Sequence, residues 1–211
     1  MVLSIFFSVL ALGSAGLTMA ADYKGKWRLG YVARPLAMLS IVAIAWSAKG
    51  AFAPPYKTFI LAGLGCSLVG DIFMMLRKKR FIEGLASFLV AQLFYIAAFK
   101  SGIIFSLSSL TFISFVIFAM LVSRLFFPYL GSLKFPVVVY VFVIVTMAGL
   151  AAERFIQIGG TKTLFAFAGA ILFVVSDLVL AVNRFVKPFR LAQLCILSTY
   201  FLAQWLIAMS V

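Results

Sequence analysis

The stretch GLGCSLVGDIFMMLRKKRF, residues 63–81, places one carboxylate, Asp71, inside an apolar run that ends at four basic residues. A second stretch, GAILFVVSDLVLAVNRF at residues 169–185, repeats this arrangement around Asp177. An apolar run of about twenty residues is long enough to cross a bilayer as a helix. The basic end then marks the membrane surface. Each acid is expected on the order of 10 Å inside that surface, given the rise per residue of an α-helix.

Similar runs recur along the whole chain of 211 residues, of which 65% are hydrophobic and 11% charged. A soluble domain carries roughly a quarter charged residues, so the composition predicts an all-α integral membrane protein. We expect one transmembrane helical domain over residues 1–211. The first run could also be a signal peptide, but its basic flank follows it, which favours a retained helix. The eight expected transmembrane helices cover residues 2–21, 32–48, 57–76, 82–99, 103–123, 135–152, 162–183 and 191–209.

Most of the 18 Lys and Arg residues lie in or beside the connections after the first, third, fifth and seventh segments. Cytoplasmic loops carry an excess of these residues, so we expect those connections to face the cytoplasm and both termini to lie outside. The compact loops favour a bacterial inner membrane. The same distribution accounts for the net charge of +13. We therefore expect no nucleic-acid partner, and leave the oligomeric state open.

Features of the first half recur about a hundred residues later. A glycine stands eight residues before each buried acid, a proline follows a basic residue near the start of two segments, and a tyrosine recurs in the fourth and eighth segments. This pattern predicts two parallel four-helix repeats, residues 1–100 and 103–211, related by an axis along the membrane normal. The matched pairs are Gly63 and Gly169, Pro35 and Pro136, and Tyr95 and Tyr200.

Asp71 and Asp177 are the candidate catalytic residues. An ionisable side chain near mid-membrane costs roughly 2.5–3.5 kcal/mol on insertion scales, whereas Asp22, Glu83 and Glu153 fall at predicted helix ends that water reaches. A repeat axis would bring the two membrane acids together. Apolar surroundings and a second carboxylate both favour the neutral form of an acid, so one Asp would be protonated and the other ionised. Such a pair suits acid/base catalysis or a proton pathway.

The other residue types limit which catalytic and metal sites the chain could form. Histidine is absent, which excludes Ser-His-Asp catalysis, histidine-ligated haem and most zinc sites. Cys66 and Cys195 lie in apolar runs and are interpreted as packing residues. We expect no cofactor and no metal. The polar side chains within helices are either hydrogen-bond partners between helices or ligand contacts; they are Gln92, Tyr95, Tyr140, Asn183, Tyr200 and Gln204.

Several motifs resemble the YhhN family of lysoplasmalogenases. They are SLVGDIFMML at 67–76, RFIEGLASFLVAQLFYIAAF at 80–99, LFVVSDLVLAVNRF at 172–185 and YFLAQWLIAM at 200–209. The segments RPLAML from Arg34 and VYVFVIVTM around Tyr140 are similar too, so the resemblance covers residues from about 30 to the end. It implies an eight-helix enzyme whose two membrane aspartates match Asp71 and Asp177. In that family a histidine often stands at the position of Gln92, so the resemblance supports no proton relay there and leaves the two aspartates as the candidate proton donors and acceptors.

The resemblance implies hydrolysis of the vinyl ether of lysoplasmalogen to a fatty aldehyde and glycerophosphoethanolamine or glycerophosphocholine. An acid protonates the β-carbon, and an anion stabilises the resulting cation or activates water. The lysophospholipid phosphate is expected near Arg or Lys. A proton-coupled transporter and a non-catalytic membrane scaffold are the alternatives. The candidate substrate contacts are Arg34, Gln92, Tyr95, Tyr140, Asn183, Arg184, Tyr200 and Gln204.

Overall fold

A computed structural model describes residues 2–48, 54–76, 80–104 and 110–211. Within these residues the chain forms eight α-helices and no strand. Seven of these helices are long and apolar enough to cross a membrane, and α5, with 17 residues, is a shorter apolar helix. The protein is an integral membrane protein. The helices are α1 (Val2–Tyr23), α2 (Trp27–Ser47), α3 (Pro54–Met75), α4 (Phe81–Lys100), α5 (Leu110–Phe126), α6 (Lys134–Ile158), α7 (Thr161–Ala181) and α8 (Ala192–Met209).

Short helical turns form part of two of the connections. The 3-10 turns η1 (Phe127–Tyr129) and η2 (Gly131–Leu133) join α5 to α6, and a π-helical turn, η3 (Val182–Val186), extends α7.

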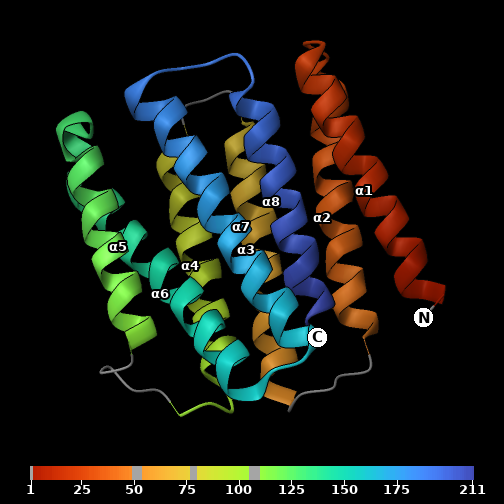
Figure 1. Ribbon diagram of the computed structural model, residues 1–211. Helices are drawn as coiled ribbons and strands as arrows, with labels where there is room; N and C mark the ends of the chain where they lie inside the picture. Colours follow the sequence, from red (N-terminus) through yellow and green to blue (C-terminus); the bar gives the residue numbers. More distant parts are fainter. Residues whose placement is uncertain (1, 49–53, 77–79, 105–109) are drawn as a thin grey trace.

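The helices run alternately up and down, and both ends of the chain lie at the lower end of the bundle in Figure 1. Successive helices from α1 to α4 and from α5 to α8 pack as antiparallel neighbours, as short loops require.

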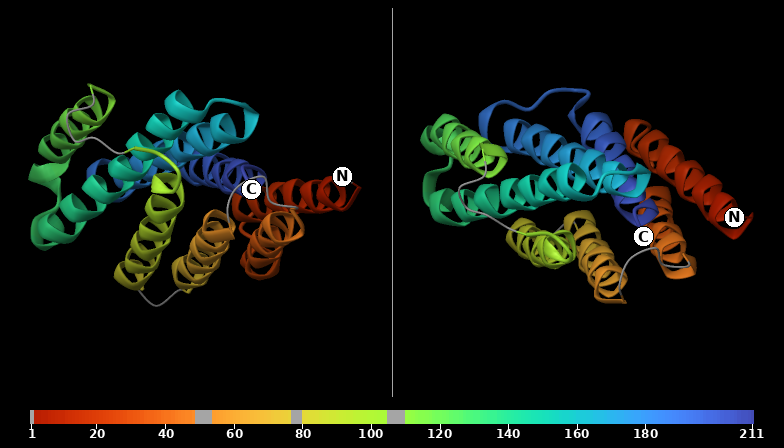
Figure 2. Two further views of the ribbon diagram at one scale, coloured as in Figure 1. Left: turned by 90° about the horizontal axis from the view of Figure 1, so that it is seen from below. Right: turned by 60° about the horizontal axis from the view of Figure 1, so that its bottom comes forward.

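The eight helices pack as four hairpins. The α1–α2 and α5–α6 hairpins lie at opposite sides of the bundle, and the α3–α4 and α7–α8 hairpins lie between them (Figures 1 and 2). Helix α8 contacts α1, α2 and α3 besides α7, while α6 contacts α4 besides α5 and α7. The two hairpins that carry Asp71 and Asp177 thus form the centre of the molecule.

Glycines allow these central hairpins to pack closely. A Cβ at Gly169 of α7 would lie 2.9 Å from the carbonyl oxygen of Ala203 and 2.8 Å from Cγ1 of Ile207, both on α8. Gly63 of α3 meets the ring of Tyr95 of α4 in the same way. Small residues at such contacts let helix backbones approach, which is the usual basis of helix association in membranes.

The helix boundaries differ from the expected segments at the polar ends. Helix α2 begins at Trp27 instead of residue 32, so Pro35 lies inside it and does not open it. Helix α6 continues to Ile158, beyond the expected residue 152. A helix can extend past its apolar run because its backbone hydrogen bonds do not depend on side-chain polarity. The expected fifth segment began at residue 103, but α5 begins at Leu110, and residues 105–109 lie outside the described parts of the chain.

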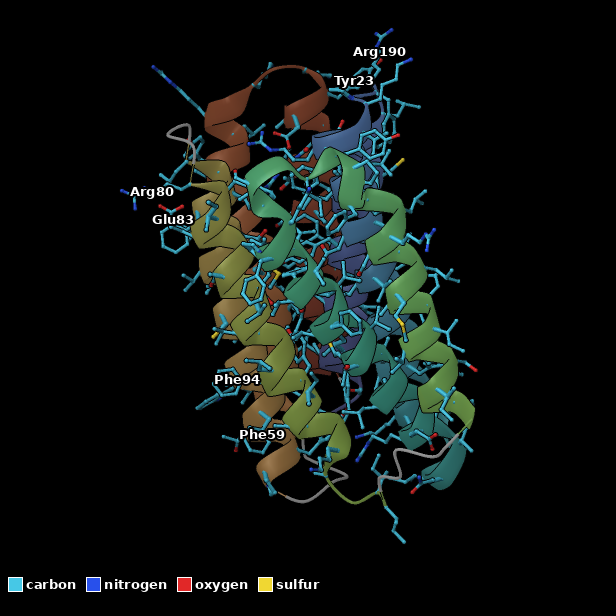
Figure 3. The ribbon with its side chains drawn as sticks, turned by 90° about the vertical axis from the view of Figure 1, so that its left-hand side faces the viewer. Tyr23, Phe59, Arg80, Glu83, Phe94 and Arg190 are labelled. Atoms are coloured by element: carbon cyan, nitrogen blue, oxygen red, sulfur yellow. The ribbon has the colours of Figure 1, made fainter. Side chains whose placement is uncertain are left out.

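One acid lies elsewhere than expected. Glu153 was expected at a water-accessible helix end, but it is buried within α6, with an exposed fraction of 7%. Its carboxylate accepts a hydrogen bond from Gln157 Nε2 at 3.3 Å. The prediction failed because α6 is longer than its apolar run. Glu83 does lie exposed in the first turn of α4, near Arg80 at the upper end of the bundle in Figure 3.

Candidate active site

Asp71 lies near the upper end of α3 and is buried, with an exposed fraction of 3%. Its Oδ2 accepts a hydrogen bond of 2.8 Å from the hydroxyl of Tyr200, which α8 contributes. The adjacent Gly70 leaves room for the ring of Phe88, because a Cβ there would lie 2.9 Å from Phe88 Cζ. The ring of Phe88 in turn packs edge-on against Tyr200. Close packing therefore fixes the tyrosine that orients Asp71.

Asp177 lies in the penultimate turn of α7 and is partly exposed. Its Oδ2 accepts a hydrogen bond of 2.5 Å from the hydroxyl of Tyr140 on α6. Each acid thus has one tyrosine donor. The donors come from different places: Tyr200 belongs to α8, which is distant in the chain from α3, whereas Tyr140 belongs to α6, the helix that precedes α7. The surroundings of the two acids are therefore unlike, even though their sequence contexts match.

Both acids line a single cavity of about 400 Å³ at this end of the bundle. The cavity has a polar wall with three arginines and an apolar wall of Phe, Leu, Ile and Met side chains. A cavity of this size and mixed lining is typical of a small-molecule site. The polar lining residues are Arg34, Asp71, Arg80, Ser176, Asp177, Asn183, Arg184, Gln193 and Tyr200.

Three arginines line the cavity beside the two acids, and among the described residues none of them forms an ion pair with Asp71 or Asp177. Arg34 of α2 lies within electrostatic range of Asp71 and forms an ion pair of 3.2 Å with Asp22. Arg184 of η3 lies over the ring of Phe81, 5.0 Å from its centroid. Asn183 accepts a hydrogen bond from the backbone N–H of Phe189, which ties the connection to α8 back to η3. An anionic group entering the cavity would meet positive charge close to both acids.

A second, apolar hollow of about 50 Å³ adjoins the cavity at Asp177. It lies between α5, α6, α7 and the start of α4, and shares Phe81, Asp177 and Leu180 with the cavity. Tyr140 lines it beside Asp177. We call it the apolar groove; its further lining includes Leu85, Phe118, Val122, Phe126, Val137, Val141, Ile144, Val145, Val174 and Phe185.

Three of the predicted contact residues lie apart from the cavity. Tyr95 donates a hydrogen bond of 2.7 Å to Gln204, which donates one of 3.0 Å to Ser67. This network joins α4, α8 and α3 in the core. Gln92 is fully buried beside Tyr140 and does not line the cavity. The structure therefore brings together Arg34, Tyr140, Asn183, Arg184 and Tyr200 around the two acids, but not Gln92, Tyr95 and Gln204.

Sequence reasoning missed two polar residues that line the cavity. Gln193 stands in the first turn of α8, where a polar residue at a helix start carries no special signal. Ser176 precedes Asp177, and its hydroxyl donates to the carbonyl of Ile196 at 3.0 Å. Of the basic tetrad at residues 77–80, only Arg80 is described, and it lines the cavity. Among the described residues, no three of His, Cys, Asp or Glu come close enough to hold a metal ion.

The fold and the site define a polytopic α-helical membrane protein with two acids in one cavity near the end of the bundle. Residues 29–211 match the YhhN family, and the chain belongs to that family. It is 33% identical over 190 residues to the human protein Lysoplasmalogenase TMEM86A, covering 83% of this chain and 74% of that one.

Two other relatives show the two names found among similar proteins, lysoplasmalogenase and YhhN. The chain is 34% identical over 182 residues to mouse Lysoplasmalogenase TMEM86B, covering 82% of this chain and 71% of the relative. It is 28% identical over 197 residues to "Uncharacterized membrane protein YhhN" of Escherichia coli O157:H7, covering 93% and 94% of the two chains. No solved structure gives a significant match to this chain.

Proposed function

We propose that this protein is a lysoplasmalogenase that hydrolyses the vinyl ether of a lysoplasmalogen. The products are a fatty aldehyde and glycerophosphoethanolamine or glycerophosphocholine. The enzyme class is supported by the mammalian relatives of that name, which match most of the chain. The observation that carries the mechanism is that Asp71 and Asp177 line one cavity between arginines and an apolar groove.

The two hollows suit the two ends of a single-chain lipid. The apolar groove would hold the first methylenes of the alkenyl tail among Phe, Leu, Ile and Val side chains, with the rest of the tail in the surrounding lipid. The phosphate would lie in the polar cavity near Arg34 and Arg184. The vinyl ether joins the tail to the glycerol, so it falls where the groove and the cavity meet.

Asp177 is the residue at that junction and is proposed as the general acid. It borders both hollows, so it can reach the β-carbon, which is the vinyl carbon that is bonded to the tail and not to the ether oxygen. Its proton forms the new C–H bond, and the ether oxygen stabilises the resulting oxocarbenium ion. Tyr140 holds the carboxyl group in place through its hydrogen bond of 2.5 Å.

Asp71 is proposed as the base. It lines only the polar cavity, where water has access, and its Oδ2 is oriented by Tyr200. The Asp71 carboxylate takes a proton from the water that attacks the oxocarbenium carbon, which gives a hemiacetal. The hemiacetal collapses when its C–O bond to glycerol breaks: the glycerol oxygen takes the proton from Asp71, and the hemiacetal hydroxyl gives its proton to Asp177, which restores both acids. The net reaction adds one water and releases the aldehyde.

The same proposal includes the membrane arrangement. The excess of Lys and Arg in the connections at the cavity end supports a cavity that faces the cytoplasm, with both termini outside, in a bacterial inner membrane. Two parallel repeats, residues 1–100 and 103–211, are supported by the helix contacts, because α2 contacts α8 just as α4 contacts α6. An axis that exchanges the halves requires both contacts.

The test is direct. Purified protein is incubated with a 1-alkenyl lysophosphatidylethanolamine, and fatty aldehyde is measured with a hydrazine reagent. The 1-acyl analogue serves as the control substrate, because it has no vinyl ether to protonate. Aldehyde release from the alkenyl substrate alone supports the proposal. A protein that releases no aldehyde but carries protons across a vesicle membrane would be a transporter, and the proposal would be wrong.

A further inference from the structure

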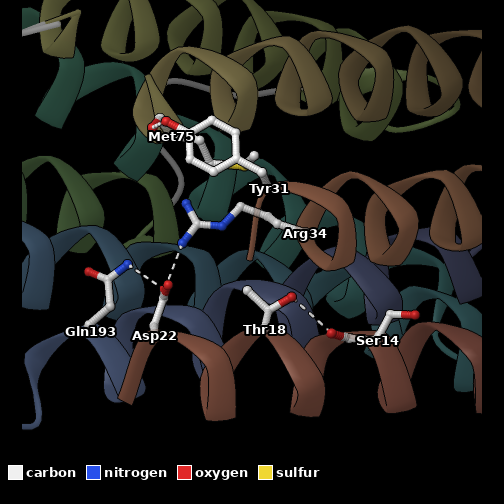
Figure 4. Close-up of polar contacts among 7 residues, drawn as sticks. All are labelled: Ser14, Thr18, Asp22, Tyr31, Arg34, Met75 and Gln193. Carbon is white, nitrogen blue, oxygen red and sulfur yellow. Dashed lines mark hydrogen bonds and ion pairs between the residues drawn. The ribbon is translucent and has the colours of Figure 1, made fainter. Parts of the chain in front are cut away.

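A second group of polar side chains lies beside the cavity, at the ends of α1 and α8. Asp22 of α1 pairs with Arg34 of α2 at 3.2 Å, and Gln193 of α8 donates a longer hydrogen bond of 3.5 Å to the same oxygen of Asp22 (Figure 4). Tyr31 lies on the other side of Arg34 and donates its hydroxyl to the carbonyl of Met75 at 2.6 Å. The group ties α1, α2, α3 and α8 together at one end of the bundle.

This group encloses a hollow of about 340 Å³, lined by Asp22, Gly30, Tyr31, Arg34, Met74, Met75 and Gln193. The hollow adjoins the catalytic cavity, because Arg34, Met74 and Gln193 line both. Arg34 therefore stands between Asp71 on one side and Asp22 on the other. Asp71 lines the catalytic cavity, Asp22 lines the outer hollow, and Arg34 lines both.

The Asp22–Arg34 pair could simply hold α1 against α2, but both side chains keep polar atoms that could bind a further group. Both hydrogen bonds described for Asp22 fall on Oδ2, and its side chain remains 28% exposed. The Oδ1 atom lies beside Gly30, where a Cβ would be 3.3 Å away. Arg34 is buried, with an exposed fraction of 7%, and its Nε–H has no partner among the described residues. A buried donor without a partner is costly, which points to a ligand acceptor.

We infer that this hollow is a subsite for a cationic head group, in which Asp22 binds the ammonium of ethanolamine or choline and Arg34 binds the phosphate. The inference rests on the proposed function, which supplies the lysophospholipid. The order of groups in the lipid matches the order of residues: vinyl ether at Asp177 and Asp71, phosphate at Arg34, ammonium at Asp22. A zwitterion satisfies both members of the ion pair, so neither charge is left alone when the substrate binds.

The inference is tested by binding, without catalysis. The probes are two saturated 1-alkyl ether lysophospholipids, which have no vinyl ether to hydrolyse. One carries phosphoethanolamine, and the other carries phosphopropanol, in which a methyl group replaces the ammonium. Affinities are measured by calorimetry with the full-length protein in detergent. The native protein is expected to prefer the ethanolamine lipid by about tenfold, as a charge-assisted contact would give.

Asp22→Asn keeps the shape of the side chain but removes its charge. This variant is expected to bind both lipids with affinities within about twofold of each other, because the ammonium has lost its partner. If Asp22→Asn weakens both lipids equally and keeps the preference, Asp22 only supports the fold and the inference is wrong. Thermal unfolding of the variant is measured alongside, to show that the protein binds as a folded bundle.

Gly30→Ala tests the same hollow without touching a charge. Its new methyl group would lie 3.3 Å from Asp22 Oδ1 and narrow the space around it. The substitution favours helix formation within α2. Binding of the phosphocholine lipid is expected to fall about fivefold more than binding of the phosphoethanolamine lipid, because a trimethylammonium is larger. Equal loss for both would place the head group elsewhere.

The proposed hydrolase activity and the proposed head-group subsite can be refuted separately. Absence of aldehyde release by the native protein would overturn the hydrolase, whatever the binding preference. Aldehyde release together with no preference for the cationic head group would overturn the subsite and leave the hydrolase standing.

Discussion

Replacing Tyr200 with Phe removes one hydroxyl group and tests whether the hydrogen bond to Asp71 matters for catalysis. The bond is 2.8 Å long and its donor is buried, with an exposed fraction of 5%. The ring packs against Phe88, Phe173 and Phe201 at centroid distances of 5.7, 5.7 and 5.4 Å, and Phe keeps these contacts. The change therefore isolates the hydrogen bond.

The expected magnitude follows from the charge of the acceptor. A hydrogen bond to a charged group contributes about 1.5–3 kcal/mol, and about 1.4 kcal/mol corresponds to a tenfold change in rate. If Asp71 must be held toward the attacking water, Tyr200→Phe lowers kcat by about 10- to 100-fold. KM should change by less than about threefold, because in the proposed mechanism this hydroxyl is bonded to Asp71 and acts through it, although Tyr200 lines the cavity.

The assay measures aldehyde release from the alkenyl substrate, with Tyr56→Phe as the matched control. Tyr56 is equally buried and shares a hydrogen bond of 2.7 Å with Ser210, but it lies at the start of α3, far along the helix from Asp71. Both variants should lose similar thermal stability, and only Tyr200→Phe should lose turnover. A Tyr200→Phe enzyme with kcat within about twofold of native would refute the role given to this bond.

Three further outcomes are expected. Gly169→Ala should destabilise the bundle by about 1–3 kcal/mol, because its methyl group would overlap the α8 backbone; Gly65→Ala, with open space around it, should leave the unfolding temperature within a few degrees of native. Val145→Phe fills the apolar groove and should lower kcat/KM for the alkenyl substrate by at least about tenfold; an unchanged kcat/KM would show that the tail does not enter the groove. Treatment with a chelator should leave turnover unchanged, and loss of activity that is restored by a divalent ion would contradict hydrolysis by aspartates alone.

The sequence predicted the class of fold and the two acids for one reason. Apolar runs and the cost of a buried carboxylate are local properties, so Asp71 and Asp177 can be recognised from their neighbours in the chain. The proximity of Arg34 to Asp71 is not local, because it depends on how α2 packs against α3. It could not be anticipated from the residues around either side chain.

The tyrosines show the same limit. Tyr95, Tyr140 and Tyr200 are alike in sequence, since each stands within an apolar helix. Tyr140 and Tyr200 donate to the two acids, while Tyr95 donates to Gln204 in the core. Only the rotation of each helix about its axis decides which partner a tyrosine meets. Hydrophobic periodicity is weak in a helix that is apolar all round, so the sequence does not fix that rotation.

The most direct measurement of the central claim compares Asp71→Asn and Asp177→Asn with the native protein in the aldehyde assay. Each variant keeps the size of the side chain, and each should lower kcat by at least about 10²-fold while the saturated ether lipid still binds. The double variant should be little worse than either single one, because the two acids act as a unit. Near-native turnover by either single variant would contradict a shared mechanism in this cavity.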